Sequence, residues 1–466
     1  MAAWSATGVS SRRSVPERTL VPCRPVTDDD LRKLLSRRRF LLGAALGVTA
    51  FLADAGATVV RAAIAPRPGV REGRLITGRG SKIWDPEPYV TPERLAPRTL
   101  PARDPAPPMS AEFRRPGLRT KIGQMLLIGF AGTAAGPDSP VVRELTRNAV
   151  GGVLLFDRAG GRRAAARNIT SPRQLRALVA DLQAAAMATP PGAPLIVAVD
   201  QEGGSVARLS RRNGFPATPT AASLGARNDP AGTRTAAEAI ARTLASMGIN
   251  LNLAPVVDVN VNPRNPAIGR NGRSFSADPA RVVAHAAAFI QGHDAVGVRT
   301  GLKHFPGQGS AAGDTHLGVV DVTRRWTDAE LGPFASLIAA GATDTVMTGH
   351  LYNRRLDAAH PATLSAKIVT GILRERLGFG GVVISDDMQM GAIRAAYGWE
   401  EAVALAIIAG VDILTIANPA RGASSVDGTV DLIEGLVASG RISEARIDAS
   451  YDRIQAFKAT LLHTPA

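Results

Sequence analysis

The chain has 466 residues, of which 45% are hydrophobic and 20% are charged, a composition typical of a globular protein. Its net charge is +15, but residues 1–120 contain 21 Lys and Arg against 11 Asp and Glu, so most of the excess lies in that segment. The rest is only mildly basic, which argues against a nucleic-acid-binding protein, and the single cysteine, Cys23, excludes an internal disulfide.

Residues 1–65 have the features of an export signal. Residues 36–42 read SRRRFLL and precede an apolar run to Leu52, the layout of a twin-arginine signal. The run is shorter than a membrane span, so we expect cleavage near residues 53–55 or after Ala65, with an uncleaved anchor as the alternative. We therefore expect an exported protein in the periplasm, cell wall or medium, with the twin-arginine export machinery as a partner.

Residues 66–117 are rich in Pro, Arg and Gly and have neither helical nor strand periodicity, which indicates a linker. Residues 1–30 suggest no function. A single catalytic domain is expected over residues 118–466.

From Leu118 onward, short apolar runs alternate with amphipathic stretches, as in a parallel α/β protein. About eight such runs predict a closed (β/α)8 TIM barrel, whereas an open doubly wound sheet lacks support because no Gly-rich phosphate turn follows the first run. The predicted strands are 124–130, 152–156, 194–200, 249–259, 298–305, 344–350, 381–386 and 411–417. Predicted helices include 171–187, 231–247, 279–295, 328–340, 365–377, 400–409 and 447–462.

Polar residues end five of these apolar runs. Because the active site of a barrel lies at the C-terminal ends of its strands, we expect them to meet on one rim. The five endings are Asp200-Gln201-Glu202-Gly203-Gly204, Asp258-Val259-Asn260, Lys303-His304-Phe305-Pro306-Gly307, Thr348-Gly349-His350 and Ser385-Asp386-Asp387. A zinc site built from His304, Asp314, His316 and His350 is conceivable, but the spacing matches no zinc signature, so no metal and no cofactor is expected.

Taken in order, these motifs together with Asp314-Thr315-His316 resemble glycoside hydrolase family 3, and more closely its single-barrel β-N-acetylglucosaminidases. The resemblance runs from about Leu118 to about Leu461. It implies that Asp386 is the nucleophile of a retaining mechanism and that Asp314 and His316 form an acid/base dyad. From the residues alone, Asp387 would be an N-cap of the following helix, because neighbouring carboxylates on a strand face opposite ways.

The resemblance further implies that Asp200, Arg208, Arg273, Lys303 and His304 bind the sugar, and we expect Asp200 to pair with Lys303 when no sugar is bound. The chain departs from the family at two points. Gln308 stands where a second histidine is common, and a longer segment leaves Arg270 as an alternative to Arg273.

The expected activity is therefore hydrolysis of terminal β-linked N-acetylglucosamine, with peptidoglycan fragments as the expected carbohydrate substrate and a monomer as the expected state. A β-glucosidase or β-xylosidase of the family is less favoured, because those enzymes usually carry a second domain and this chain ends near the last barrel helix. A phosphorylase remains open, because a histidine acid/base repels phosphate less than a carboxylate. In another class, the alternative is a non-catalytic barrel that binds cell-wall sugars.

Overall fold

The computed structural model describes residues 116–159, 165–419 and 422–461. The predicted export signal, residues 1–65, and nearly all of the predicted linker, residues 66–117, lie outside this range. Within it, every helix is too short or too polar to cross a membrane.

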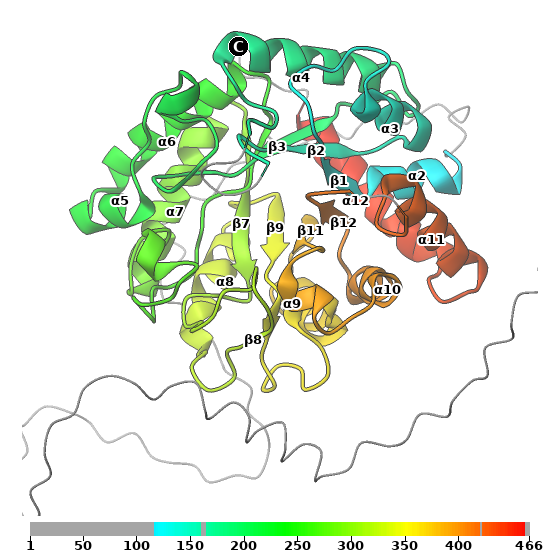
Figure 1. Cartoon of the computed structure of the whole chain (residues 1–466). Coiled ribbons are helices and arrows are strands. Elements are labelled where there is room, and N and C mark those ends of the chain that lie inside the picture. Colours follow the sequence, from blue (N-terminus) through cyan, green and yellow to red (C-terminus); the bar gives the residue numbers. More distant parts are fainter. Residues whose placement is uncertain (1–115, 160–164, 420–421, 462–466) are drawn as a thin grey trace, which may run out of the picture. The chain divides into compact units, whose positions relative to one another are not determined.

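Eight parallel strands close into a barrel, and each coincides with one of the eight predicted apolar runs (Figure 1). This confirms the predicted (β/α)8 fold. In order around the barrel the strands are β1 (Leu126–Gly129), β12 (Ile413–Ile416), β11 (Val382–Asp387), β9 (Thr345–Thr348), β7 (Arg299–Phe305), β6 (Leu251–Asn252), β3 (Ile196–Val199) and β2 (Gly152–Leu155).

Helices surround the barrel, and several begin at a Ser, Thr or Asp whose side chain accepts a hydrogen bond from the first turn, as Ser171 and Ser443 do. The segment predicted as a helix over residues 365–377 is a π-helix, η7 (Lys367–Arg376). The α-helices are α2 (Leu118–Gln124), α3 (Pro140–Asn148), α4 (Pro172–Met187), α5 (Ala221–Arg227), α6 (Pro230–Ala245), α7 (Pro279–Asp294), α8 (Gly332–Ala339), α9 (Gly391–Arg394), α10 (Trp399–Ala409), α11 (Val426–Ala438) and α12 (Glu444–Thr460).

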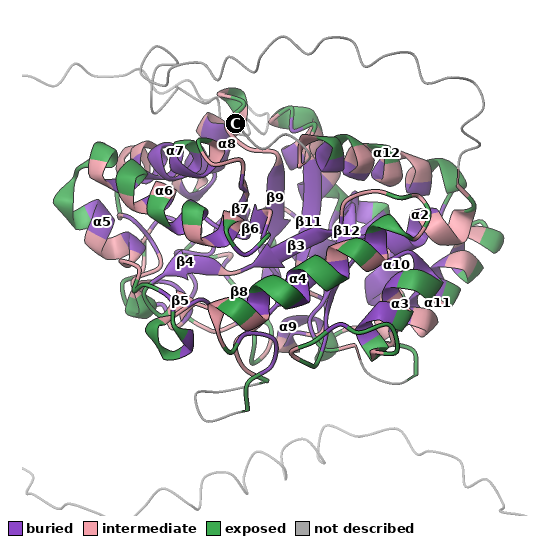
Figure 2. Ribbon diagram, turned by 90° about the horizontal axis from the view of Figure 1, so that it is seen from above, coloured by how far each residue is buried: buried purple, intermediate pink, exposed green. Residues whose placement is uncertain are grey.

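The barrel strands are almost entirely buried, whereas the exposed residues lie on the outer faces of the helices and in the loops (Figure 2). Because both faces of the sheet are covered, the sequence of each strand is almost continuously apolar. One charged cluster stabilises the N-terminal end of the barrel, where buried Asp412 accepts a hydrogen bond from Ser450 at 2.8 Å and pairs with Arg374. A second group of buried charges, which includes Glu202, Asp258 and Lys303, lies at the opposite end, where polar residues follow the strands.

Two short pairs of strands project beyond the barrel. The hairpin of β4 (Gln201–Gly203) and β5 (Val206–Ala207) follows β3, and β8 (Val320–Asp321) pairs with β10 (Leu351–Tyr352). Gly203 and Gly204 form the hairpin turn at φ 103° and 59°. A Cβ at Gly203 would lie 2.1 Å from the Pro219 carbonyl oxygen, so the turn requires glycine.

Candidate active site

The C-terminal ends of β3 and β7 hold a buried cluster of charges. The Lys303 ammonium lies 2.6 Å from an Asp200 oxygen and 2.7 Å from a Glu202 oxygen. The predicted pair between Asp200 and Lys303 is therefore present, but Glu202 is a second partner that the sequence did not reveal. Burial disfavours the charged ammonium, yet the two carboxylates raise the pKa of Lys303 overall.

Arg273 completes this cluster from the other side of Glu202. Its Nε and Nη2 each donate to a different Glu202 oxygen at 2.7 Å, a two-pronged pair. Although burial opposes ionisation of Glu202, Arg273 and Lys303 hold its pKa well below the usual range. Arg270, the alternative in sequence, is exposed, so the structure brings Arg273 to the site and not Arg270.

His304 is oriented by a carboxylate that sequence reasoning left unassigned. Asp258 is fully buried, and its Oδ2 lies 2.7 Å from His304 Nδ1. Its Oδ1 accepts hydrogen bonds from the backbone N–H groups of His304 and Gln308. The other ring nitrogen, Nε2, lies 3.3 Å from an Arg273 donor. This pattern fits a proton on Nδ1 and a free lone pair on Nε2.

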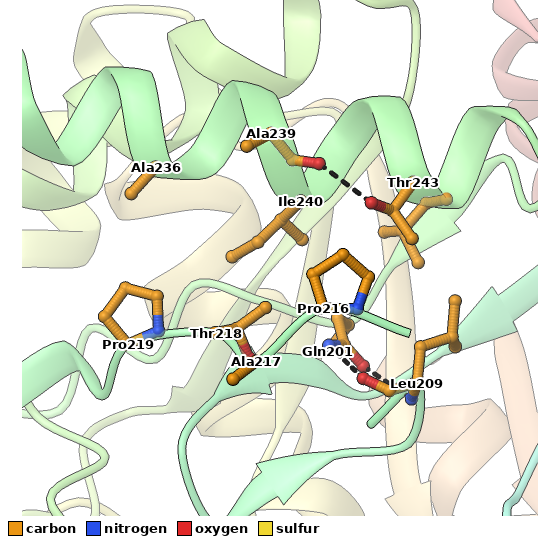
Figure 3. Close-up of a pocket in the computed structure, with 11 residues that line it drawn as sticks. Gln201, Leu209, Pro216, Ala217, Thr218, Pro219, Ala236, Ala239, Ile240 and Thr243 are labelled. Atoms are coloured by element: carbon orange, nitrogen blue, oxygen red, sulfur yellow. Dashed lines mark hydrogen bonds between the residues drawn. The ribbon is translucent and has the colours of Figure 1, made fainter. Parts of the chain in front are cut away.

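Arg208 extends over the mouth of the barrel from the end of the β4–β5 hairpin. The Gln201 amide donates to the Leu209 carbonyl at 3.0 Å and accepts from the Leu209 N–H at 2.9 Å, which fixes the chain next to Arg208 (Figure 3). The guanidinium lies 3.9 Å from carboxylate oxygens of both Asp200 and Asp157. The apolar cavity of about 140 Å³ behind Gln201 is lined by none of the predicted site residues (Figure 3).

Asp386 lies at the end of β11, partly exposed, and accepts a hydrogen bond from the backbone N–H of Asp387 at 2.8 Å. Burial opposes its ionisation, but the nearby His350, His304 and His316 and this backbone N–H lower its pKa overall. The carboxylate is therefore ionised at neutral pH, as a nucleophile must be.

Asp387 does not cap the following helix, contrary to the sequence interpretation. Helix α9 begins four residues later, after Met390, without a side-chain cap. Instead, one Asp387 oxygen accepts hydrogen bonds from the backbone N–H groups of Gln389 and Ala417, so its side chain ties the end of β11 to the loop after β12. The two adjacent carboxylates thus have different surroundings, as the alternation along a strand requires.

His350 supports the same strand end from β9. Its Nε2 lies 2.9 Å from the Asp387 carbonyl oxygen and its Nδ1 lies 2.9 Å from the Thr363 hydroxyl. Because a carbonyl only accepts, the proton lies on Nε2, and Thr363 donates to Nδ1. Burial lowers the pKa of His350, which favours this neutral form.

Asp314 and His316 form a bonded pair, with Asp314 Oδ1 2.7 Å from His316 Nδ1. The same oxygen accepts the backbone N–H of His316 at 3.0 Å. Burial opposes ionisation of Asp314, but these hydrogen bonds with His316 lower its pKa overall. The His316 side chain is 66% exposed, in contrast to the buried cluster. The arrangement leaves Nε2 of His316 open toward solvent and substrate.

The loop that carries this pair is attached through its backbone to the start of α9. Ala392 N–H donates to the Thr315 carbonyl at 3.0 Å, and Gly391 N–H donates to the His316 carbonyl at 3.3 Å. A Cβ at Gly391 would lie 2.6 Å from the His316 carbonyl oxygen, so only glycine permits this approach. Gln308, which replaces the family's histidine, donates to the Thr315 hydroxyl at 3.4 Å.

An open cleft of about 840 Å³ lies above these residues. Its walls include His316 and Arg208, so the acid/base candidate and a predicted sugar ligand share one space. Among the described residues, no group of three His, Cys, Asp or Glu side chains is arranged to hold a metal ion.

The structure thus brings together the predicted residues Asp200, Lys303, His304 and Arg273, and it sets Arg208 beside them. Sequence reasoning missed Glu202, Asp258 and His350 as contributors, although all three stand in the polar endings that marked the rim. Their position at the strand ends could therefore have marked them as site residues, but the sequence does not show which residues they bind. The catalytic and binding roles stay predictions.

The comparisons with known proteins agree with this architecture. The model of the glycosyl hydrolase family 3 N terminal domain matches residues 117–457. A beta-hexosaminidase of Xylella fastidiosa (strain M23) is 41% identical over 304 residues, 63% of this chain and 84% of that protein. Beta-hexosaminidase A of Pseudoalteromonas piscicida is 34% identical over 348 residues, 70% of this chain. The chain spans only 56% of the latter protein's length.

Solved structures show the same relationship. A family 3 beta-N-acetylglucosaminidase from Paenibacillus sp. superposes with a TM-score of 0.67 at 36% identity, covering 75% of this chain and 63% of that one. A beta-N-acetylhexosaminidase from Beutenbergia cavernae gives 0.66 at 34% identity, covering 74% and 99%. The predicted family is confirmed, and this chain belongs to glycosyl hydrolase family 3.

Proposed function

We propose that the protein is a retaining β-N-acetylhexosaminidase that removes terminal, non-reducing β-linked N-acetylglucosamine. The observation that carries the proposal is the carboxylate of Asp386 at the C-terminal end of β11, on the barrel rim that also bears His316 paired to Asp314 at 2.7 Å. The similar proteins from Xylella, Pseudoalteromonas and Beutenbergia, which are named hexosaminidases, support the same activity.

In the first step, an Asp386 oxygen attacks the anomeric carbon while the bond to the leaving-group oxygen breaks, giving a glycosyl ester on Asp386. His316, protonated, donates its Nε2 proton to the departing oxygen. In the second step, neutral His316 takes a proton from water, whose oxygen attacks the same carbon and releases Asp386. Both inversions together retain the β configuration.

Asp314 assists both steps without touching the sugar. Its hydrogen bond to Nδ1 holds the ring in place and directs the reactive lone pair or proton to Nε2.

The buried cluster suits the binding of a polyol. Asp200, Lys303, His304 and Arg273 offer charged donors and acceptors at fixed positions, and hydrogen bonds to charged groups are the stronger kind. Since Glu202 pairs with both Lys303 and Arg273, and Asp200 pairs with Lys303, the site keeps its geometry when no sugar is present.

The natural substrate that we propose is a peptidoglycan fragment outside the cytoplasm. This part rests on the SRRRFLL motif of residues 36–42 and on no structural feature. Fractionation of cells expressing the full chain would test it, because recovery in the cytosol with an intact N-terminus would refute export.

The activity is tested by release of nitrophenol from the β-N-acetylglucosaminide and the β-glucoside of p-nitrophenol, with phosphate varied. We expect turnover of the first substrate, and the Asp386→Asn chain should lose about 10⁴-fold or more in kcat, because the nucleophile is removed. Turnover of the glucoside alone would favour the β-glucosidase alternative, and acceleration by phosphate would favour a phosphorylase. Sugar binding without any turnover would favour the non-catalytic barrel.

A further inference from the structure

The cleft above the strand ends is strongly basic. Five arginines line it, together with His316, and the only carboxylate among its lining residues is Asp157. The arginines are Arg158, Arg167, Arg208, Arg211 and Arg212. A cleft of one charge sign attracts ligands of the other sign and raises their local concentration.

These arginines differ in what they already bind. Arg167 is buried, and each of its three nitrogens donates a hydrogen bond, to the carbonyls of Phe130 and Ala417 and to Asn418. Arg208 faces Asp157 and Asp200 at 3.9 Å, but its Nε is buried and has no hydrogen-bond partner within the described ranges. Since this Nε has no exposed surface, it is not available to a ligand in the cleft, and the other nitrogens of Arg208 already face carboxylates.

Arg211 and Arg212 are exposed and have no ion pair with any described residue. They form the short helix η3 (Arg211–Asn213), which Ser210 and Asn213 stabilise through a hydrogen bond of 2.7 Å between their side chains. The backbone that carries the two guanidinium groups is therefore fixed, although their charges are uncompensated.

His316 indicates which part of the substrate meets these arginines. A group that donates a proton to the glycosidic oxygen lies beside the leaving group. Because His316 lines the same cleft as Arg211 and Arg212, the leaving group occupies this cleft rather than the buried cluster around Lys303.

We infer that Arg211 and Arg212 form a subsite for an anionic oxygen group on the leaving-group side of the reaction. This inference rests on the proposed function, because it names what the same site selects. Two sources have this chemistry: a carboxylate carried by the leaving sugar, and inorganic phosphate that replaces water as the acceptor.

The first arm of the test compares two disaccharides that differ in one charge: N-acetylglucosaminyl-β-1,4-N-acetylmuramic acid and the methyl ester of its carboxyl group. For the full chain we expect kcat/KM for the acid to exceed that for the ester by about fivefold, the range of a partly exposed ion pair. In the Arg211→Gln/Arg212→Gln chain this ratio should fall to about one. Arg227→Gln, which removes an exposed arginine from α5, is the matched control and should keep the ratio.

The second arm measures N-acetylglucosamine 1-phosphate formed as inorganic phosphate is raised. If phosphate is the anion, the double variant loses phosphate-dependent product while the ratio of acid to ester stays the same in both chains. If neither the ratio nor the phosphate response differs between the parent and the double variant, the subsite does not exist.

Binding separates a failure of this inference from a failure of the proposed function. In the Asp386→Asn chain, calorimetry should give a lower Kd for the acid than for the ester, and this preference should disappear when Arg211 and Arg212 are replaced. A preference without turnover in the parent chain would overturn the proposed activity and leave the subsite intact. Equal Kd values for acid and ester, together with no phosphate response, would overturn the subsite alone.

Discussion

The two halves of the candidate site differ in how they are held. On one side, Glu202, Lys303 and His304 are each at most 6% exposed. Glu202 is paired with Arg273, and His304 is hydrogen-bonded to Asp258. On the other side, His316 is 66% exposed and is oriented by a single carboxylate. The difference corresponds to the tasks: binding needs fixed, dry partners, whereas proton transfer needs a group that exchanges protons with water.

The exposed half depends on backbone contacts more than on side-chain packing. Leu317, next to His316, is 87% exposed, and Val319 is 57% exposed, so the loop has little apolar anchorage of its own. Its fixed points are Gly391 and Ala392, which donate from the start of α9. A loop held in this way can carry its histidine without being rigid.

Of the changes that compare the two halves, removal of the exposed His316 side chain should have the largest effect on activity. His316→Ala should lower kcat on N,N′-diacetylchitobiose by about 10³-fold, a typical loss for a general acid, and should lower it much less on the p-nitrophenyl substrate, whose leaving group needs little protonation. Because the side chain is exposed, the free energy of unfolding should change by less than about 0.5 kcal/mol. Equal losses on both substrates would contradict the assigned role.

On the buried side, a substitution should affect the free energy of unfolding strongly, unlike the substitution of His316. Glu202→Gln leaves Lys303 and Arg273 with one carboxylate fewer, and a broken buried charge network should reduce the free energy of unfolding by about 3 kcal/mol. Urea denaturation measures this change, with Glu375→Gln on η7, an exposed residue, as the control. A loss no larger than in the control would show that the cluster does not hold the site together.

The third change concerns the pH dependence of stability and involves Glu330, which packs against the turn at Gly307 and Ser310. It is fully buried, and its Oε2 accepts the Ser310 N–H at 3.0 Å. Burial raises the pKa of Glu330 to about 8, against an ordinary value of 4.5. The unfolded chain therefore releases this proton at lower pH than the folded chain, so stability falls as pH rises from about 4.5 to 8 and then levels off.

Glu330→Gln removes this titration. The melting temperature of the variant relative to the parent should rise steadily between pH 5 and pH 8, measured by scanning calorimetry at fixed ionic strength. A difference that is constant over this range would contradict the shifted pKa and leave only a packing effect.

The barrel was readable from the sequence because each strand is a local apolar run, and periodicity is a property of neighbouring residues. The polar endings of those runs also predicted which rim bears the site. The assignment of Asp387 as a helix cap was wrong, because the hydrogen bond from Ala417 N–H comes from another strand's loop and no local pattern encodes it.

The sequence by itself determined the eight strands, the order of the motifs, and the presence of Asp386 at a strand end and of Asp314 and His316 in the loop after β7. Only the tertiary structure decided that Glu202 pairs with both Lys303 and Arg273. The same holds for the hydrogen bond with Asp258 that orients His304, and for the bond from the Gly391 N–H to the His316 carbonyl. These partners lie far apart in the chain, and closure of the barrel alone brings them within hydrogen-bond distance. A chain encodes periodicity through adjacent residues, but it encodes ion pairs only through the fold.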